Sequence, residues 1–264
     1  MRAVLIASVG LLALAGCDRK AEPAKPPAPV SLPAAPAAAS RPLVYEKTVP
    51  AAHVKLILPA AAAAAPALYA KLYSEGVNDL DAFADGAKEG YEELKAAGAP
   101  IRAFERELNW KVAAETPRLL GLVLEEYENT GGAHPNAALG SMVWDKQTGK
   151  ALKPLDLMRD DVNALKLDAI VCDAIHAAKK ERTGSAELQP DQRCPVFSDV
   201  KVTLAPSTAA GKAGGIQVLF SPYEVGPWVE GSYELSFPLA RIAGDLNPAY
   251  TAEFAGAPPP APEK

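Results

Sequence analysis

The sequence predicts an α+β fold in which antiparallel sheet packs against one long N-terminal helix and a second helix. A helical pattern over residues 66–97 is followed by a run of strand-like segments, and a second helical pattern near 160–180 is followed by another run. Separate runs of helix and strand, without regular βαβ alternation, are typical of α+β proteins. We therefore expect two contiguous sub-domains, an N-terminal half at 43–150 and a C-terminal half at 151–254.

The apolar pattern defines the elements of the N-terminal half. Residues 44–58 are predicted to be extended, with a break at Pro50. Between residues 66 and 97, apolar side chains recur at steps of three and four, which places them on one stripe of a helix. Residues 103–112 alternate between apolar and polar side chains, with Arg106 as the exception, as a half-buried strand does. Two further strands are predicted at 119–127 and 139–144, with a turn at 145–150.

The C-terminal half begins with the second predicted helix, from about Asp160 to Lys180. Ala164, Leu167 and Val171 share one face of it, acidic residues open it and basic residues close it, as the helix dipole favours. Three strands are predicted to follow, at 200–204, 216–220 and 233–237.

The N-terminus predicts export from the cytoplasm. Residues 1–16 contain a positive charge, a short apolar run and small residues before Cys17, which is typical of a signal peptide. The apolar run is shorter than the roughly 20 residues of a membrane-spanning helix. The last residues of this segment resemble the lipobox of bacterial lipoproteins, which implies cleavage before Cys17 and acylation of that residue. An ordinary signal peptide with a chance cysteine is the alternative.

Lipidation at Cys17 would make the lipid bilayer a partner of the chain, because more than one acyl chain anchors a protein stably. Asp18 resembles an inner-membrane retention signal, so the periplasmic side of the inner membrane is slightly favoured over the outer membrane. Residues 17–42 are predicted to be an extended tether, since 21–42 contain 15 Ala or Pro. The proline-rich tail at 255–264 is predicted to be disordered.

Composition and motifs exclude several function classes. The net charge is −5, the pI is about 5.4 and no basic stripe is present, which argues against nucleic-acid binding. The sequence contains no H-E-x-x-H, G-x-S-x-G or Walker motif, so it predicts no catalytic residues, no metal and no cofactor.

Two cysteines remain once Cys17 is assigned to the lipid. Cys172 and Cys194 are predicted to form a disulfide between the second helix and the loop after it, because an oxidising compartment favours pairing. Two buried free thiols are the alternative. A zinc site is disfavoured, since we expect no further Cys or His at ligand spacing.

The most distinctive segment is Thr130-Gly131-Gly132-Ala133-His134 between two predicted strands. We expect both glycines to have a positive φ and to form a reversal that brings His134 to the surface. A second motif, Asp-x-x-Thr-Gly-Lys, ends at Lys150 and places Gly149 in another turn.

These motifs, followed by a Pro-Tyr-Glu segment at 222–224, resemble the extracytoplasmic RsiV/PdaC-like family. That family includes the ectodomain of an anti-sigma factor that is a lysozyme receptor, and the accessory domain of a peptidoglycan deacetylase. The resemblance implies a non-catalytic binding module of the cell envelope, whose ligand is peptidoglycan or a wall-active enzyme such as a lysozyme-type muramidase. An unrecognised hydrolase of cell-wall material is the alternative, and it would need two carboxylates that converge in a cleft. The candidate binding residues are Tyr127, His134, Asn136, Tyr223, Glu224 and Trp228.

Overall fold

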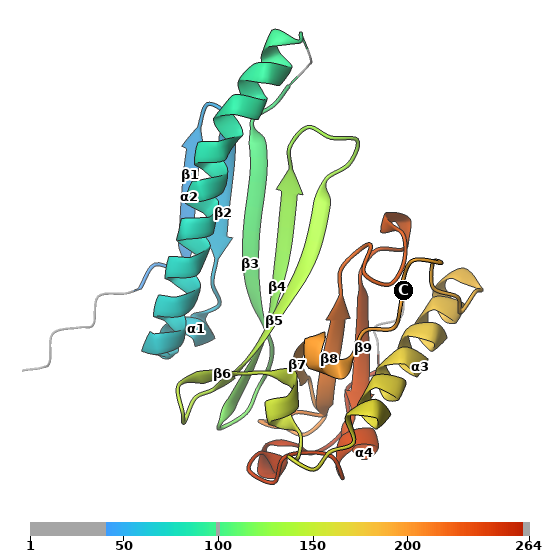
Figure 1. The fold of residues 1–264 in the computed structure, drawn as a ribbon. Coiled ribbons are helices and arrows are strands. Elements are labelled where there is room, and N and C mark those ends of the chain that lie inside the picture. The colour runs from blue at the N-terminus through green and yellow to red at the C-terminus, as the bar shows by residue number, and fades with distance from the viewer. Residues whose placement is uncertain (1–40, 99–100, 261–264) are drawn as a thin grey trace, which may run out of the picture. The chain divides into compact units, whose positions relative to one another are not determined.

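The computed structural model describes residues 41–98 and 101–260, which form a six-stranded mixed sheet, a three-stranded antiparallel sheet and four α-helices (Figure 1). The predicted α+β class is confirmed. The predicted signal peptide, the lipidation site Cys17, residues 17–40 of the tether and the last four residues of the tail lie outside the described residues. Within the described residues, no helix has the length and apolar character needed to cross a membrane.

The larger sheet has the strand order β1-β2-β3-β4-β5-β6. Its strands are β1 (Val44–Val49), β2 (Ala52–Ile57), β3 (Phe104–Glu115), β4 (Leu119–Asn129), β5 (Asn136–Asp145) and β6 (Lys150–Leu152). All neighbours are antiparallel except β2 and β3, which are parallel. The expectation of purely antiparallel sheet is wrong at this pair, because the chain crosses over between the two strands through helices and re-enters in the same direction.

That crossover consists of α1 (Ala60–Ala64) and the long helix α2 (Pro66–Ala96). Figure 1 shows α2 running along the face of the sheet beside β2 and β3. Its buried stripe includes Leu68, Leu72 and Leu80, each at most 2% exposed. At Gly76 the helix approaches β2 so closely that a Cβ atom would lie 2.9 Å from the terminal methyl groups of Leu56, so any larger residue would require the Leu56 side chain to shift.

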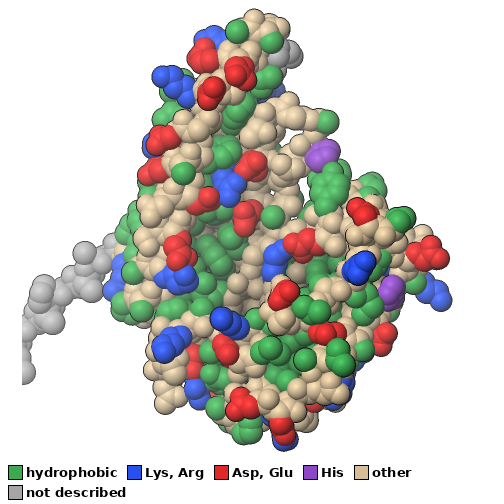
Figure 2. Space-filling view, viewed as in Figure 1, with side chains coloured by type: hydrophobic (Ala, Val, Ile, Leu, Met, Phe, Trp, Pro, Cys, Tyr) green, Lys and Arg blue, Asp and Glu red, His purple; other side chains and the backbone are tan. Residues whose placement is uncertain are grey.

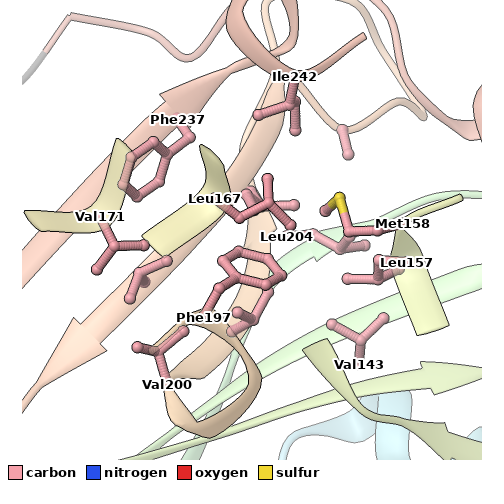
Figure 3. Close-up of a cluster of buried hydrophobic side chains, with 14 of the residues drawn as sticks. Val143, Leu157, Met158, Leu167, Val171, Phe197, Val200, Leu204, Phe237 and Ile242 are labelled. Carbon is pink, nitrogen blue, oxygen red and sulfur yellow. The ribbon is translucent and has the colours of Figure 1, made fainter. Parts of the chain in front are cut away.

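The C-terminal half places one helix against the smaller sheet. Its elements are α3 (Ala164–Thr183), β7 (Lys201–Ala205), β8 (Gly215–Phe220), β9 (Tyr233–Pro238) and α4 (Leu239–Ile242). Figure 3 shows Leu167 and Val171 of α3 pointing toward Phe197, Leu204 and Phe237 in a continuous hydrophobic core. This core also holds Val143 of β5, so the two sheets share apolar contacts.

Two predicted boundaries differ from the structure. The helix predicted from Asp160 begins at Ala164, because the side chain of Asn163 caps it by accepting a hydrogen bond from Lys166 N. The tail predicted to be disordered from 255 pairs with the body at its start: Ala255 N donates to Ala213 O at 3.0 Å, and Ala257 O accepts from Thr208 N at 2.9 Å. Proline content predicts an extended backbone, but it does not reveal that this backbone forms hydrogen bonds with the folded body.

The Asp-x-x-Thr-Gly-Lys motif forms the turn between β5 and β6 and is held by a buried carboxylate. Asp145 has no exposed side chain, and Arg118 donates to it through Nε and Nη2, the latter at 2.7 Å. Gln147 N donates to the same carboxylate at 2.9 Å. Gly149, with φ 67°, closes the turn through a hydrogen bond to Asp145 O. The motif is therefore explained by folding, since its buried carboxylate and the N–H groups of Gln147 and Gly149 all have partners within the turn or its neighbours.

Candidate functional site

Three of the candidate residues meet at the surface, although two separate loops supply them. His134 lies in the β4–β5 loop, and Tyr223 and Trp228 lie in the β8–β9 loop. The rings of His134 and Trp228 are stacked, with centroids 4.2 Å apart and an angle of 25° between their planes. The Tyr223 hydroxyl lies 3.4 Å from His134 Nε2. We call His134, Tyr223 and Trp228 the aromatic cluster; Tyr223 is 58% exposed and Trp228 36% exposed.

The β8–β9 loop is held in place next to the larger sheet. Leu139 N of β5 donates to the Ser221 hydroxyl at 3.0 Å, and this contact joins the start of the loop to the sheet. Tyr223 has a φ of 73°, which is strained for a residue with a Cβ atom, and Gln192 Nε2 donates to its carbonyl at 2.8 Å. Strain of this kind persists only where the surroundings enforce it, and it is concentrated at functional sites.

Two further candidates, Tyr127 and Asn136, line a pocket of about 140 Å³ together with Arg106. Arg106 forms ion pairs with Glu126 and Glu128 of β4, and with Asp79 of α2. The sequence does not predict these charged residues as site residues. Arg106 could nevertheless have been singled out from the sequence, because it occupies a position where the alternating pattern of its strand predicts an apolar residue.

The sixth candidate, Glu224, has a structural role. Its carboxylate accepts hydrogen bonds from Ser221 N at 3.0 Å and from Lys201 Nζ, which close the first turn of the β8–β9 loop. Because both donors belong to the protein itself, the Glu224 carboxylate stabilises the conformation of the loop that carries Tyr223.

The Thr130-Gly131-Gly132 turn behaves differently at its two glycines. Gly131 has a φ of 81°, and its N–H donates to the side chain of Asn129 at 3.0 Å. Gly132 does not have a positive φ, so the expectation for this residue is wrong. A Cβ atom on Gly132 would meet one backbone atom, His134 O, at 3.9 Å. One left-handed residue is sufficient because the six-residue loop has room to reverse more gradually than a tight turn.

This difference leads to a paired prediction. Gly131→Ala should reduce the free energy of unfolding by about 1–2 kcal/mol, because a side chain is strained in the left-handed region. Gly132→Ala should change it by less than roughly 0.5 kcal/mol, as at an unconstrained surface position. Chemical denaturation of both variants checks this, and equal losses would contradict the conformations described here.

The two cysteines form the expected disulfide. The bond joins Cys172 on α3 to Cys194 on the following loop, with the Cα atoms 5.3 Å apart. The expectation that no histidine lies at ligand spacing is wrong. His176 lies one helical turn after Cys172, and its Nε2 atom is 3.7 Å from Cys194 Sγ.

Carboxylates also converge, as a glycoside hydrolase would require. In a pocket of about 290 Å³ between α2 and the sheet, Asp79 and Glu126 lie 2.9 and 3.5 Å from the same Nη2 atom of Arg106. One nitrogen of the Arg106 guanidinium group therefore contacts both carboxylates.

The carboxyl groups whose pKa is shifted do not have the direction of shift that a general acid needs. Among the described residues, every carboxyl whose pKa departs clearly from its ordinary value has it lowered, whereas a general acid needs a raised pKa. These residues are Asp81, Asp145, Asp161, Glu230 and Glu253.

Comparison with known families divides the chain into two matched segments. The family described as deacetylase PdaC matches residues 46–137, and a family described as a protein of unknown function (DUF3298) matches residues 156–240. The first segment contains His134 and the second contains Tyr223 and Trp228, so the aromatic cluster draws on both. No curated protein matches the chain.

Two solved structures are similar to this chain. A DUF3298 family protein from Bacteroides fragilis has a TM-score of 0.54 and 16% sequence identity, with 80% of this chain and 96% of that chain covered. A DUF3298 family protein from Pseudomonas aeruginosa PAO1 has a TM-score of 0.49 and 16% identity, with 82% and 99% covered. The Bacteroides structure supports the fold described above.

Proposed function

Because the chain belongs to the PdaC/DUF3298-like family, we propose that it is a non-catalytic binding module of the bacterial cell envelope. The two matched domains indicate an extracytoplasmic, envelope-associated role. The aromatic cluster is the observation that carries the proposal. It is exposed, it is made by two loops fixed to rigid strands, and it includes a strained residue. Loops positioned by a rigid scaffold are where binding residues concentrate.

Peptidoglycan is the ligand that this surface fits best. Flat aromatic faces such as that of Trp228 stack on sugar rings, and polar groups beside them bind hydroxyl and amide groups. The nearby pocket offers such groups through Asn136, Glu128 and Arg106.

A wall-active enzyme such as a lysozyme-type muramidase is the second candidate ligand, and a different observation favours it. Acidic side chains lie along α2 (Figure 2), which contains seven Asp or Glu and three Lys. Among the described residues, Asp79 and Asp81 are paired with cations of the sheet, and the other five carboxylates of the helix are not. A surface of this charge would attract a basic protein.

The hydrolase alternative depends on the carboxylates of Asp79 and Glu126. Arg106 forms an ion pair with each of them, and this argues for a structural or binding role of the group. Release of reducing sugar from purified peptidoglycan by the wild-type protein would support the hydrolase. Arg106→Gln would remove the cation that pairs with the two carboxylates.

The binding proposal is tested with the purified full-length protein and two probes. We expect it to sediment with purified peptidoglycan in a saturable manner. A parallel titration with a lysozyme-type muramidase, monitored by calorimetry, tests the second ligand. Binding to neither probe would contradict the proposed function.

We further propose that Cys17 carries the lipid anchor and that the protein is attached to a membrane on its periplasmic side. Cys17→Ser should leave an unlipidated precursor, because the thiol that accepts the diacylglycerol is lost. Metabolic labelling with a palmitate analogue measures this directly. Label that remains on the Cys17→Ser protein would refute the proposal.

A further inference from the structure

The disulfide between Cys172 and Cys194 is part of a larger arrangement on α3. Asp168, Cys172 and His176 follow one another at intervals of four residues and therefore share one side of the helix. Each contacts the segment that runs back along the helix. Asp168 Oδ1 accepts a hydrogen bond from Phe197 N at 2.7 Å, Cys172 is bonded to Cys194, and His176 Nδ1 lies 2.5 Å from Ala186 O.

The hydrogen bond of His176 determines which ring nitrogen is free. Because the Ala186 carbonyl can only accept, Nδ1 carries the proton and donates it, and Nε2 of the neutral ring keeps its lone pair. That lone pair is on the side of the sulfurs, with Nε2 3.7 Å from Cys194 Sγ. Histidines that bind metals have this second-shell arrangement, in which the other ring nitrogen donates to a carbonyl or carboxylate.

The distances fit a tetrahedral metal ion. Sulfur and nitrogen ligands bound to zinc at about 2.0–2.3 Å lie roughly 3.5–3.8 Å from each other. In this structure the two sulfurs and Nε2 all lie within 4.8 Å of one another. Nε2 and the Cys194 sulfur are already at such a distance, 3.7 Å. Once the disulfide is reduced, the two sulfurs must separate, and both cysteines are half-buried side chains that can rotate.

We propose that Cys172, His176 and Cys194 form a zinc site when the disulfide is reduced, with water as the fourth ligand. A dithiol reduces the bond: it is itself oxidised to a cyclic disulfide, and its two electrons and two protons yield two thiols. Zinc ion then replaces the two thiol protons, which are released to solvent. Reoxidation by a disulfide re-forms the Cys172–Cys194 bond and expels the metal.

The fold keeps the three ligands together after reduction. The contacts of Asp168 with Phe197 and of His176 with Ala186 lie on either side of the disulfide along the helix. They hold the returning segment in place when the covalent link is broken. The three ligands are distinct from the aromatic cluster, although Gln192 of the same returning loop donates to the Tyr223 carbonyl. Failure to bind zinc therefore leaves the proposed envelope binding standing.

The test uses the full chain with Cys17→Ser, in which Cys172 and Cys194 are the only thiols. We expect no reactive thiol before reduction. After anaerobic reduction, one equivalent of cobalt(II) should give the visible bands of a tetrahedral ion and a thiolate-to-cobalt charge-transfer band, and zinc should displace it. A reduced protein that gives no charge-transfer band overturns the proposal, as does one that unfolds and is not refolded by zinc.

Histidine variants separate this site from adventitious binding. His176→Ala should weaken zinc affinity by more than the roughly 10–100-fold typical of losing a second-shell partner. His53→Ala is the matched control, because His53 lies on β2 and contacts Thr48, and its affinity should equal that of the parent. His176→Cys should restore a tetrahedral site and raise the charge-transfer absorbance by about half, since three thiolates replace two. Unchanged zinc affinity in His176→Ala, or no added absorbance in His176→Cys, overturns the assignment of His176.

Discussion

Asp145→Asn should lower the free energy of unfolding by about 3 kcal/mol, the low end of the range for removing one partner of a buried ion pair. Asp145 is fully buried, whereas its partner Arg118 is 24% exposed and keeps some hydration when the charge is lost. An amide also accepts fewer hydrogen bonds than the carboxylate does from Arg118 and Gln147 N. For a domain of this size the melting temperature should fall by roughly 6–12 °C, as measured by calorimetry.

Asp161→Asn is the matched control. Asp161 forms a similar ion pair with Arg159 at 2.8 Å, but its side chain is 70% exposed. Exposed pairs contribute about 0–1 kcal/mol, so this variant should melt close to the wild-type temperature. Equal effects of the two substitutions would show that burial of Asp145 is not what makes its ion pair important.

Acid sensitivity offers an independent measurement on Asp145. Burial raises the pKa of its carboxyl, but hydrogen bonds from Arg118 and the backbone of Gln147 and Thr148 outweigh burial and lower the pKa to about 2. A carboxyl group with a lowered pKa stabilises the folded protein at pH values above the ordinary pKa of 3.8. That contribution is lost as the pH falls toward 2. The loss should be about 2 kcal/mol, at 1.36 kcal/mol per unit. Asp145→Asn should lack this part of the acid dependence.

The elements of the fold could be predicted because most of them are amphipathic. Both long helices and the strands β3, β7, β8 and β9 are visible as local periodicities, and the structure places them within a few residues of the predictions. The parallel pairing of β2 with β3 could not be predicted in this way. Strand order depends on where the crossover helix returns the chain, and no local pattern of residues records that.

The candidate site could be predicted residue by residue but not as an arrangement. His134 and Tyr223 are 89 residues apart, and their contact depends on the packing of one loop beside another. The placement of Cys172 and His176 on one face of the helix could be predicted, because residues four apart share a helix face. What the sequence did not reveal is that the loop after α3 folds back and brings Cys194 to the same place.

Trp228→Ala should weaken binding of the envelope ligand by about 30-fold, which corresponds to the roughly 2 kcal/mol lost at a binding hot spot. Trp228 offers a large planar surface that is 36% exposed and is held by stacking on His134. Its removal deletes the contact area and frees the His134 ring. His134→Ala should reduce affinity less, because Trp228 then keeps its surface but loses its support. Both variants should melt within a few degrees of the wild type, since neither side chain is part of a buried cluster.

Trp110→Ala is the control that locates the binding surface. Trp110 is a half-buried tryptophan of β3 that lines the pocket between α2 and the sheet, away from the β8–β9 loop. If the aromatic cluster binds the ligand, Trp110→Ala should retain wild-type affinity for peptidoglycan and for the muramidase. If Trp110→Ala abolishes binding while Trp228→Ala leaves it intact, the ligand occupies the pocket between α2 and the sheet, and the aromatic cluster only joins two loops. A melting temperature that falls in step with affinity in Trp228→Ala would likewise assign that residue to the fold.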